Sequence, residues 1–178
     1  MFIVSTPIGN LGDLTERGAA VLAAADRIVA EDTRRARTLL AHLGIQSRPV
    51  SLHAHNEAKR TAQVVEWLGE GLDVAMVSDA GTPLLSDPGE RAVAGAIEAG
   101  HTVVPVPGPS AILAGLVASG LPCSSFTFHG FLPRAAGKRA KVLERIESSP
   151  ETAVIFESPT RLDSLLSDLE NRVGNERR

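Results

Sequence analysis

The regular alternation of short apolar runs with segments of helix length, repeated along the whole chain, is the feature that most limits the possible fold. Strands connected through helices pair in parallel, and helices then cover both faces of the sheet. The apolar runs predict strands at 2–5, 27–31, 50–53, 73–78 and 102–106. The segments between them predict helices at 15–25, 34–43, 56–69 and 89–99. We therefore expect an α/β fold with a doubly wound, mostly parallel sheet.

Residues at the expected helix ends support this assignment. Asn56 can N-cap the third helix, and Ser110 can N-cap a further helix over 111–119. Gly44 and Gly100 fall where helices should stop, because glycine readily adopts the left-handed conformation found at helix C-termini.

The segment Gly120-Leu121-Pro122 marks an expected domain boundary, which gives a first domain at 1–120 and a second at 121–178. The second should contain strands at 125–128 and 152–156, a basic helix near 138–146 and a helix from about Arg161. Two strands are too few to close a sheet-based core. We therefore expect the second α/β domain to be incomplete.

Composition limits the cellular compartment in which the chain is expected and the partners that it could bind. Cys123 is the only cysteine, which excludes a disulfide framework within the chain and fits a reducing compartment. The N-terminus lacks the features of a signal peptide, and no apolar run approaches the roughly 20 residues of a membrane span. We expect a cytoplasmic protein with no membrane partner. With 3% aromatic residues and a formal net charge of −3, any binding of nucleic acid must depend on local features.

Glycine, proline and polar residues collect directly after each expected strand of the first domain. These loops contain the segments Thr6-Pro7-Ile8-Gly9-Asn10, Glu31-Asp32-Thr33-Arg34, His53-Ala54-His55-Asn56-Glu57, Asp79-Ala80-Gly81-Thr82-Pro83 and Pro107-Gly108-Pro109-Ser110-Ala111. Glycine and proline fix turns and let the backbone approach a ligand closely. In an open α/β sheet, ligands bind beyond the carboxyl ends of the strands. Five such loops on one edge therefore predict a binding cleft.

Three common nucleotide-binding and hydrolase motifs are absent from the sequence. There is no G-x-x-x-x-G-K-[ST], no G-x-G-x-x-G and no G-x-S-x-G segment. The P-loop kinase, dehydrogenase and α/β-hydrolase interpretations therefore lose their main support.

Two pairs of residues in the loops each allow two interpretations. His53 and His55 could lie on one strand face as metal ligands, or they could form a strand end and a polar loop without a metal. Glu31 and Asp32 could act in catalysis, or they could simply suit a helix N-terminus, which favours negative charge.

Eight segments, taken together and in order, identify a protein family more specifically than any one loop does. They are Thr6-Pro7-Ile8-Gly9-Asn10-Leu11, Glu31-Asp32-Thr33-Arg34, His55-Asn56-Glu57, Ser78-Asp79-Ala80-Gly81-Thr82-Pro83, Ser86-Asp87-Pro88-Gly89, Pro107-Gly108-Pro109-Ser110-Ala111, Gly130-Phe131-Leu132-Pro133 and Glu157-Ser158-Pro159. Along nearly the whole chain, this combination resembles the tetrapyrrole methylase superfamily, and within it the branch that methylates ribosomal RNA.

The resemblance implies a two-domain enzyme, usually a homodimer, that binds S-adenosylmethionine between its domains. It implies methylation of the ribose 2′-hydroxyl of a cytidine in the decoding region of small-subunit ribosomal RNA. The substrate would be this RNA, free or within the small ribosomal subunit. No metal and no further cofactor are implied.

The resemblance also assigns residues to the methyl donor. These are Pro7, Asp79, Ala80, Gly81, Thr82, Pro83, Ser110 and Ala111, and more loosely Phe156, Glu157, Ser158 and Pro159. Asp79 can accept hydrogen bonds from the donor, and its carboxylate suits the donor's positive charge. Ser110, at an expected helix N-terminus, can bind the donor's polar end.

Further residues are expected to face RNA or to carry the chemistry. The RNA-side residues are Asn10, Asp13, Arg17, Arg34, Asn56, Glu57, Lys138 and Arg139. Lys138 and Arg139 belong to a basic segment over 134–145, which is either a solvated helix face or a surface for RNA phosphate. A base could take the ribose proton, and the candidates Glu31, Asp32 and His55 are not ranked by the sequence.

Two other functions stay open. A tetrapyrrole precursor could be the methylated substrate on the same fold, although the segments Glu31–Arg34 and His55–Glu57 disfavour it. A non-catalytic fragment that binds S-adenosylmethionine or RNA is the other alternative, because the sequence stops at Arg177-Arg178 before the second domain is expected to be complete.

Overall fold

The computed structural model describes residues 1–174, and contacts divide the chain into two units, Met1–Ala111 and Ile112–Arg178. We call them unit 1 and unit 2. The last four residues of the expected second domain, 175–178, lie outside the described residues. The domain boundary near Gly120 stays a prediction.

Unit 1 is built on a five-stranded sheet in the order β3-β2-β4-β1-β5. The strands are β1 (Phe2–Val4), β2 (Arg27–Ala30), β3 (Val50–Ser51), β4 (Val74–Val77) and β5 (Val104–Val106). Every neighbouring pair is parallel. The predicted parallel α/β sheet is therefore confirmed.

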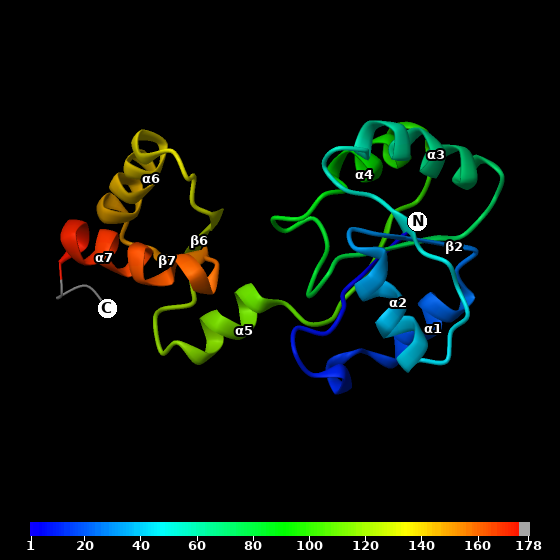
Figure 1. Cartoon of the computed structure of the whole chain (residues 1–178), viewed down its shortest axis with the longest axis horizontal. Coiled ribbons are helices and arrows are strands. Elements are labelled where there is room, and N and C mark those ends of the chain that lie inside the picture. The colour runs from blue at the N-terminus through cyan, green and yellow to red at the C-terminus, as the bar shows by residue number, and fades with distance from the viewer. Residues whose placement is uncertain (175–178) are drawn as a thin grey trace. The chain divides into compact units, whose positions relative to one another are not determined.

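Helices cover both faces of this sheet (Figure 1). Helices α1 (Glu16–Ala24) and α2 (Thr33–His42) lie on one face, and α3 (Glu57–Gly69) and α4 (Glu90–Glu98) lie on the other. A short 3₁₀ helix, η1 (Leu11–Asp13), precedes α1, and α5 (Ala111–Ala118) follows β5. None of the helices in the described residues is long and apolar enough to cross a lipid bilayer.

The central strand β4 explains why both faces are covered. Its residues alternate between the two sides, and all four are buried. Val74 and Met76 belong to the core under α3 and α4. Ala75 and Val77 belong to the core under α1 and α2. A strand that is apolar on both sides fits only between two layers of helices.

The helix ends agree with the sequence in most places. Gly44 (φ 71°) and Gly100 (φ 80°) follow α2 and α4 in the left-handed conformation, as predicted. Asn56 is at the predicted N-cap position of α3, but its side chain makes no cap hydrogen bond to the helix. The Asn56 side chain instead accepts a hydrogen bond from the backbone N–H of His53 at 2.9 Å, which closes the turn before the helix.

Unit 2 contains two parallel strands, β6 (Phe126–Phe131) and β7 (Thr152–Phe156). The helices α6 (Ala136–Ser148) and α7 (Leu162–Val173) and the 3₁₀ helix η2 (Pro159–Arg161) complete the described part. β6 extends beyond its predicted end at 128, because an irregularity between Phe128 and Phe131 shifts the register and lets pairing continue. The small core consists of Leu132, Leu143, Ile146 and Leu165, with partly buried neighbours.

Replacing Leu22 with alanine should lower the free energy of unfolding by about 2–5 kcal/mol, because it leaves a cavity under α1. The Leu22 side chain is 1% exposed in the core on that face of the sheet. Urea unfolding followed by circular dichroism measures the change. Leu11→Ala, at a site that is 48% exposed, is the control and should change stability by less than about 0.5 kcal/mol. Equal stability of the two variants would contradict this packing.

Candidate functional site

The loops after β1, β4 and β5 are joined to one another at the carboxyl edge of the sheet. Thr6 and Gly81 pair through two backbone hydrogen bonds, of 2.9 and 3.0 Å, between each residue's N–H and the other's carbonyl oxygen. The Thr82 hydroxyl lies 3.1 Å from that of Ser5 and donates to the carbonyl oxygen of Pro109 at 3.1 Å. Three loops that the sequence assigned to the donor therefore meet at one place.

The loop after β5 approaches β1 more closely than a side chain would permit. A Cβ atom at Gly108 would lie 2.9 Å from the Cβ of Ser5. The eight donor residues expected in unit 1 differ in exposure. Ala80 and Ala111 are exposed. The partly buried residues are Pro7, Asp79, Thr82 and Ser110, and the buried ones are Gly81 and Pro83. The edge thus offers both backbone and side chains to a ligand.

Asp79 connects the loop after β4 with the start of α2. Its Oδ1 accepts a hydrogen bond from the backbone N–H of Asp32 at 3.1 Å, and its Oδ2 lies 3.3 Å from Nε of Arg35. A carboxylate can accept more bonds than these two, and the Asp79 side chain is 30% exposed. Asp79 can therefore hold the loops together and still accept a bond from a ligand. Arg35 was missed by the sequence analysis, although it directly follows the segment Glu31–Arg34.

Asp32, one of the three candidate bases, is engaged at the N-terminus of α2. Its carboxylate accepts a hydrogen bond from the backbone N–H of Arg34 at 2.8 Å and forms an ion pair of 2.7 Å with the Arg34 guanidinium. These hydrogen bonds, led by the one from the guanidinium, hold the pKa of Asp32 well below its usual range. Such a carboxylate stays charged and is a weak proton acceptor.

Glu31, the second candidate base, faces a small cavity together with Asp87. The cavity is lined by Ala30, Glu31, Leu52, Met76, Val77, Ser78, Asp87 and Pro88, and it is too small to hold a water molecule. Burial raises the pKa of Glu31, and the nearby Asp87 and Asp79 raise it further. Burial also raises the pKa of Asp87, against a hydrogen bond from Ser78 that lowers it. Asp87 was not among the expected site residues, although it stands in the Ser86–Gly89 segment.

His55, the third candidate base, lies on the surface. Its ring is exposed and stands edge-on to that of His53, with 6.0 Å between the centroids. Within residues 1–174, no group of three or more His, Cys, Asp and Glu side chains is arranged to hold a metal ion. Of the two candidate carboxylates, Glu31 has a raised pKa and Asp32 a lowered one, so Glu31 is the stronger proton acceptor of the two.

The residues expected to face RNA divide into exposed and internally bonded groups. Arg17 and Asp13 are exposed, and Arg17 lies 3.5 Å from the carbonyl oxygen of Pro105. Asn10 is exposed and caps η1 by accepting a hydrogen bond from the Gly12 N–H at 3.0 Å. Arg34 is paired with Asp32, as described above. Asn56 and Glu57 bond to other segments of unit 1.

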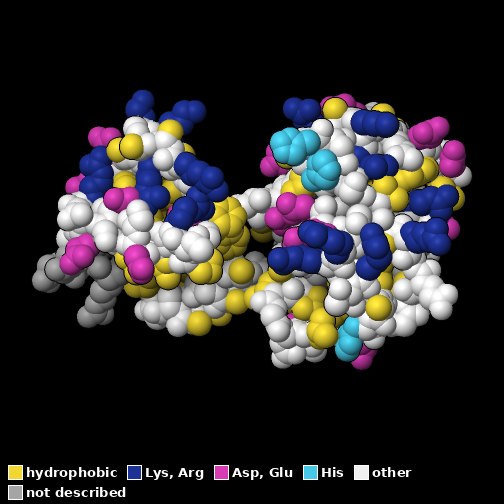
Figure 2. All heavy atoms as spheres, in the orientation of Figure 1, with side chains coloured by type: hydrophobic (Ala, Val, Ile, Leu, Met, Phe, Trp, Pro, Cys, Tyr) yellow, Lys and Arg dark blue, Asp and Glu magenta, His cyan; other side chains and the backbone are white. Residues whose placement is uncertain are grey.

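The basic segment of unit 2 separates into two faces of α6. Lys138, Lys141 and Arg145 are exposed and follow one another at intervals of three and four residues, so they share one side of the helix. We call them, with the exposed Arg134 that precedes the helix, the basic stripe. Figure 2 shows Lys and Arg side chains gathered over α6.

Arg139 turns away from the basic stripe. Its side chain is 14% exposed and forms ion pairs with Asp168 at 2.6 Å and with Glu157 at 3.9 Å. Arg161 pairs with the same Glu157 at 2.5 Å. A hydrogen bond from the Ser158 N–H, together with both arginines, lowers the pKa of Glu157. These charges therefore tie β7 to α6 and η2.

The remaining expected donor residues of unit 2 lie at the end of β7. The Phe156 ring packs against Phe128 and Phe131, with centroids 4.9 and 5.6 Å apart. The Ser158 hydroxyl lies 2.9 Å from that of Thr160. Pro159 is exposed at the start of η2.

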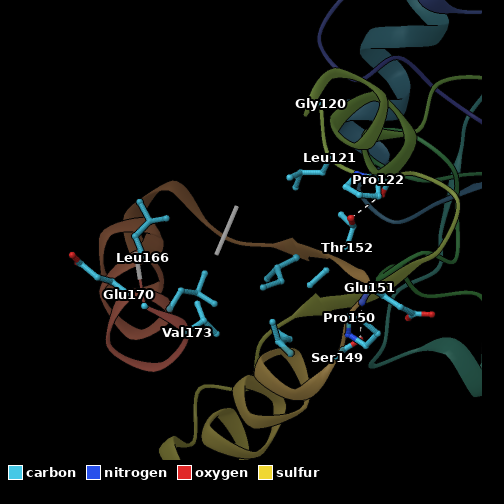
Figure 3. A pocket seen from close by; sticks show the side chains of 15 residues that line it. Gly120, Leu121, Pro122, Ser149, Pro150, Glu151, Thr152, Leu166, Glu170 and Val173 are labelled. Atoms are coloured by element: carbon cyan, nitrogen blue, oxygen red, sulfur yellow. Dashed lines mark hydrogen bonds between the residues drawn. The ribbon is translucent and has the colours of Figure 1, made fainter. Parts of the chain in front are cut away.

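A separate open hollow of about 1020 Å³ lies elsewhere in unit 2. Figure 3 shows Leu166, Glu170 and Val173 of α7 along one side of it and Thr152 on another, with the Thr152 hydroxyl bonded to the carbonyl oxygen of Pro122 at 2.7 Å. Apolar side chains make up much of the lining. None of the residues that the sequence assigned to donor or RNA lines this hollow.

Several curated proteins named ribosomal RNA small subunit methyltransferase I are similar to the chain. The protein from Mesorhizobium japonicum is 48% identical over 178 residues, which cover 100% of this chain and 60% of that protein. Those from Vibrio cholerae and Escherichia coli O157:H7 are 48% and 46% identical, each over 99% of this chain and 62% of theirs. The chain spans about three fifths of the length of these relatives.

The fold is also found in a solved structure. The crystal structure of a conserved hypothetical protein from Aeropyrum pernix K1 matches with a TM-score of 0.73 over 98% of this chain and 66% of that chain, at 22% sequence identity. The family described as Tetrapyrrole (Corrin/Porphyrin) Methylases matches residues 1–178. With a match over all of its residues and relatives close to half identical, the chain belongs to the tetrapyrrole methylase family.

Proposed function

We propose that the protein is an S-adenosylmethionine-dependent methyltransferase that modifies the ribose 2′-hydroxyl of a cytidine in the decoding region of small-subunit ribosomal RNA. The observation that carries this proposal is the 48% identity, along the whole chain, to proteins named for methylation of that RNA. These relatives favour RNA over a tetrapyrrole precursor. The proposal includes a cytoplasmic location, where small ribosomal subunits are found, and the homodimer expected from the resemblance.

The joined loops after β1, β4 and β5 have a chemistry that suits the methyl donor. S-adenosylmethionine supplies a methyl group on a positively charged sulfur. Asp79 offers a carboxylate toward that charge, and the backbone around Gly81 and Thr82 is held in a fixed shape by Thr6 and Ser5. A site fixed before binding loses less entropy when a ligand is aligned for in-line transfer.

Glu31 is the base in this proposal. As the ribose oxygen bonds to the methyl carbon and the bond from carbon to sulfur breaks, the hydroxyl proton passes to the Glu31 carboxylate. The raised pKa of Glu31 makes it a stronger proton acceptor than an exposed glutamate. Asp32 is already bonded to Arg34, which leaves its carboxylate less suited to this role.

The basic stripe supports RNA as the substrate. Arg134, Lys138, Lys141 and Arg145 are all exposed, in a chain whose formal net charge is −3. A local row of positive charges binds the phosphate backbone without needing base-specific contacts. Arg139, which the sequence grouped with Lys138, acts within the protein in this proposal and not on RNA.

Replacing Asp79 with alanine should weaken S-adenosylmethionine binding about tenfold or more, because a hydrogen bond to a charged group contributes roughly 1.5–3 kcal/mol. Isothermal titration calorimetry measures the affinity. Arg35→Ala is the matched control, because it removes the partner of Asp79 but keeps the carboxylate. It should weaken binding less. Unchanged affinity in Asp79→Ala, or equal losses in both variants, would count against contact with the donor.

Methyl transfer should decline as the pH falls through the raised pKa of Glu31, since the base acts only when deprotonated. Glu31→Gln should slow transfer by about 10²–10⁴-fold at neutral pH. Asp87→Asn removes a charge that raises this pKa, so the decline should move to lower pH. Transfer rates measured across pH test this, with the exposed Glu98→Gln as control. A decline at the same pH in Asp87→Asn would refute the assignment.

Changing Lys138, Lys141 and Arg145 together to alanine should weaken binding to small-subunit ribosomal RNA. The slope of log affinity against log salt should also fall by about two, since each phosphate contact contributes roughly 0.7–0.9. Fluorescence anisotropy at several salt concentrations measures both. Arg48→Ala is the control, because Arg48 is an exposed arginine that precedes β3 in unit 1 and is not part of the basic stripe. An unchanged slope in the triple variant would remove the basic stripe from the RNA interface.

A further inference from the structure

Asn56 and Glu57, which the sequence analysis placed on the RNA side, make their bonds inside unit 1. The Asn56 amide nitrogen donates to the carbonyl oxygen of Ser51 at 3.2 Å, and its amide oxygen accepts from the N–H of His53. The Glu57 side chain is only 14% exposed. A carboxylate that is this buried needs partners within the protein.

The partners of Glu57 lie at the N-terminus of α4. Its Oε1 accepts hydrogen bonds from the backbone N–H groups of Gly89, at 2.9 Å, and Arg91, at 3.2 Å. Its Oε2 lies 3.9 Å from Nε of Arg91. The first N–H groups of a helix have no partner within the helix, and a negative charge is favourable there. The N-cap residue of α4 is Gly89, which has no side chain for this purpose, so Glu57 of α3 takes the place of the cap.

The residues just before this cap are held in an unfavourable backbone conformation. Leu84 (φ 75°) and Ser86 (φ 70°) are both in the left-handed region, which is unfavourable for residues that carry a side chain. Gly89 (φ 124°) is packed so tightly that a Cβ atom there would lie 2.7 Å from Sδ of Met76. Such a conformation persists only where surrounding contacts impose it.

The contacts that impose this conformation lie at the two ends of the segment. At one end, the Thr82 hydroxyl contacts Ser5 and Pro109. At the other end, Glu57 holds the N–H groups of Gly89 and Arg91. Between these ends stands Asp87, which lines the same small cavity as Glu31. Gly89 follows Asp87 by two residues, so the contacts that fix Gly89 limit where the Asp87 backbone can lie relative to Glu31. A hydrogen bond from Ser78 also holds the Asp87 carboxyl group.

We propose that Glu57 is a positioning residue that caps α4 from α3 and thereby holds Asp87 beside Glu31, the base of the proposed methyl transfer. The inference rests on the proposed function only for the role of Glu31 as a base. The charged groups near Glu31 are Asp87, Asp79 and Asp32, which raise its pKa, and Arg35, which lowers it. Only Asp87 lies in the segment that Glu57 anchors.

Nuclear magnetic resonance titration of ¹³C-labelled glutamate side chains tests the proposal without relying on methyl transfer. The Glu31 signal is assigned by its loss in Glu31→Gln. In Glu57→Ala, Asp87 is released, so the Glu31 midpoint should move to lower pH. Amide hydrogen exchange at Gly89 and Arg91 should become about tenfold faster or more, because each N–H loses its hydrogen bond to Glu57. Glu57→Gln keeps an oxygen acceptor and should restore most of both properties.

Two further variants separate positioning from a general loss of structure. Glu90→Gln changes an exposed glutamate in the first turn of α4 and should leave the Glu31 midpoint and the exchange rates unchanged. In an Asp87→Asn background, Glu57→Ala should no longer move the Glu31 midpoint, because the two changes act through one path.

An unchanged Glu31 midpoint in Glu57→Ala, or an equal shift with and without Asp87, overturns the proposal even if exchange becomes faster. The predicted shift, found in a protein that transfers no methyl group to ribosomal RNA, supports the positioning role and refutes the proposed function instead.

Discussion

Parallel pairing of all five strands in unit 1 is the constraint on which the rest of the structure depends. Because β3, β2, β4, β1 and β5 run in one direction, the loops that follow them emerge at a single edge. The backbone pairing of Thr6 with Gly81 then joins two of these loops directly beyond the strands. Without the parallel order, the polar segments after each strand would lie on opposite sides of the sheet and could not form one site.

Polar groups at this edge bond the loops to one another, and they are also available to bond to a ligand. Asp79 links the loop after β4 to α2, Thr82 links it to the loop after β5, and Glu57 closes the start of α4. These bonds let Leu84 and Ser86 keep a backbone conformation that they would not adopt alone. Bonds within the protein therefore hold the loops at this edge in one arrangement, and under the proposed function this arrangement favours alignment of a donor and a hydroxyl for in-line transfer.

Local sequence patterns were sufficient to predict the framework. Strand and helix order follow from apolar periodicity, and the positions of Gly44 and Gly100 follow from the conformational freedom of glycine, so each could be predicted from neighbouring residues alone. The direction in which a charged side chain points could not be predicted from neighbouring residues. Lys138 and Arg139 are adjacent, yet Lys138 is exposed and Arg139 pairs with Glu157 and Asp168. These two partners are distant in sequence and lie beside Arg139 only because of the tertiary fold. Glu57 and Gly89, which are joined by a hydrogen bond, are likewise separated by 32 residues, so neighbouring residues could not predict that contact either.

The proposed function places the methyl donor at the joined loops after β1, β4 and β5. A crystal structure of the protein with S-adenosylhomocysteine, the demethylated form of the donor, would test this most directly. The ligand is predicted to contact the backbone around Gly81 and Thr82 and the carboxylate of Asp79. Density for the ligand in the hollow beside α7, or anywhere away from the carboxyl edge of the sheet, would contradict binding of the donor at the joined loops.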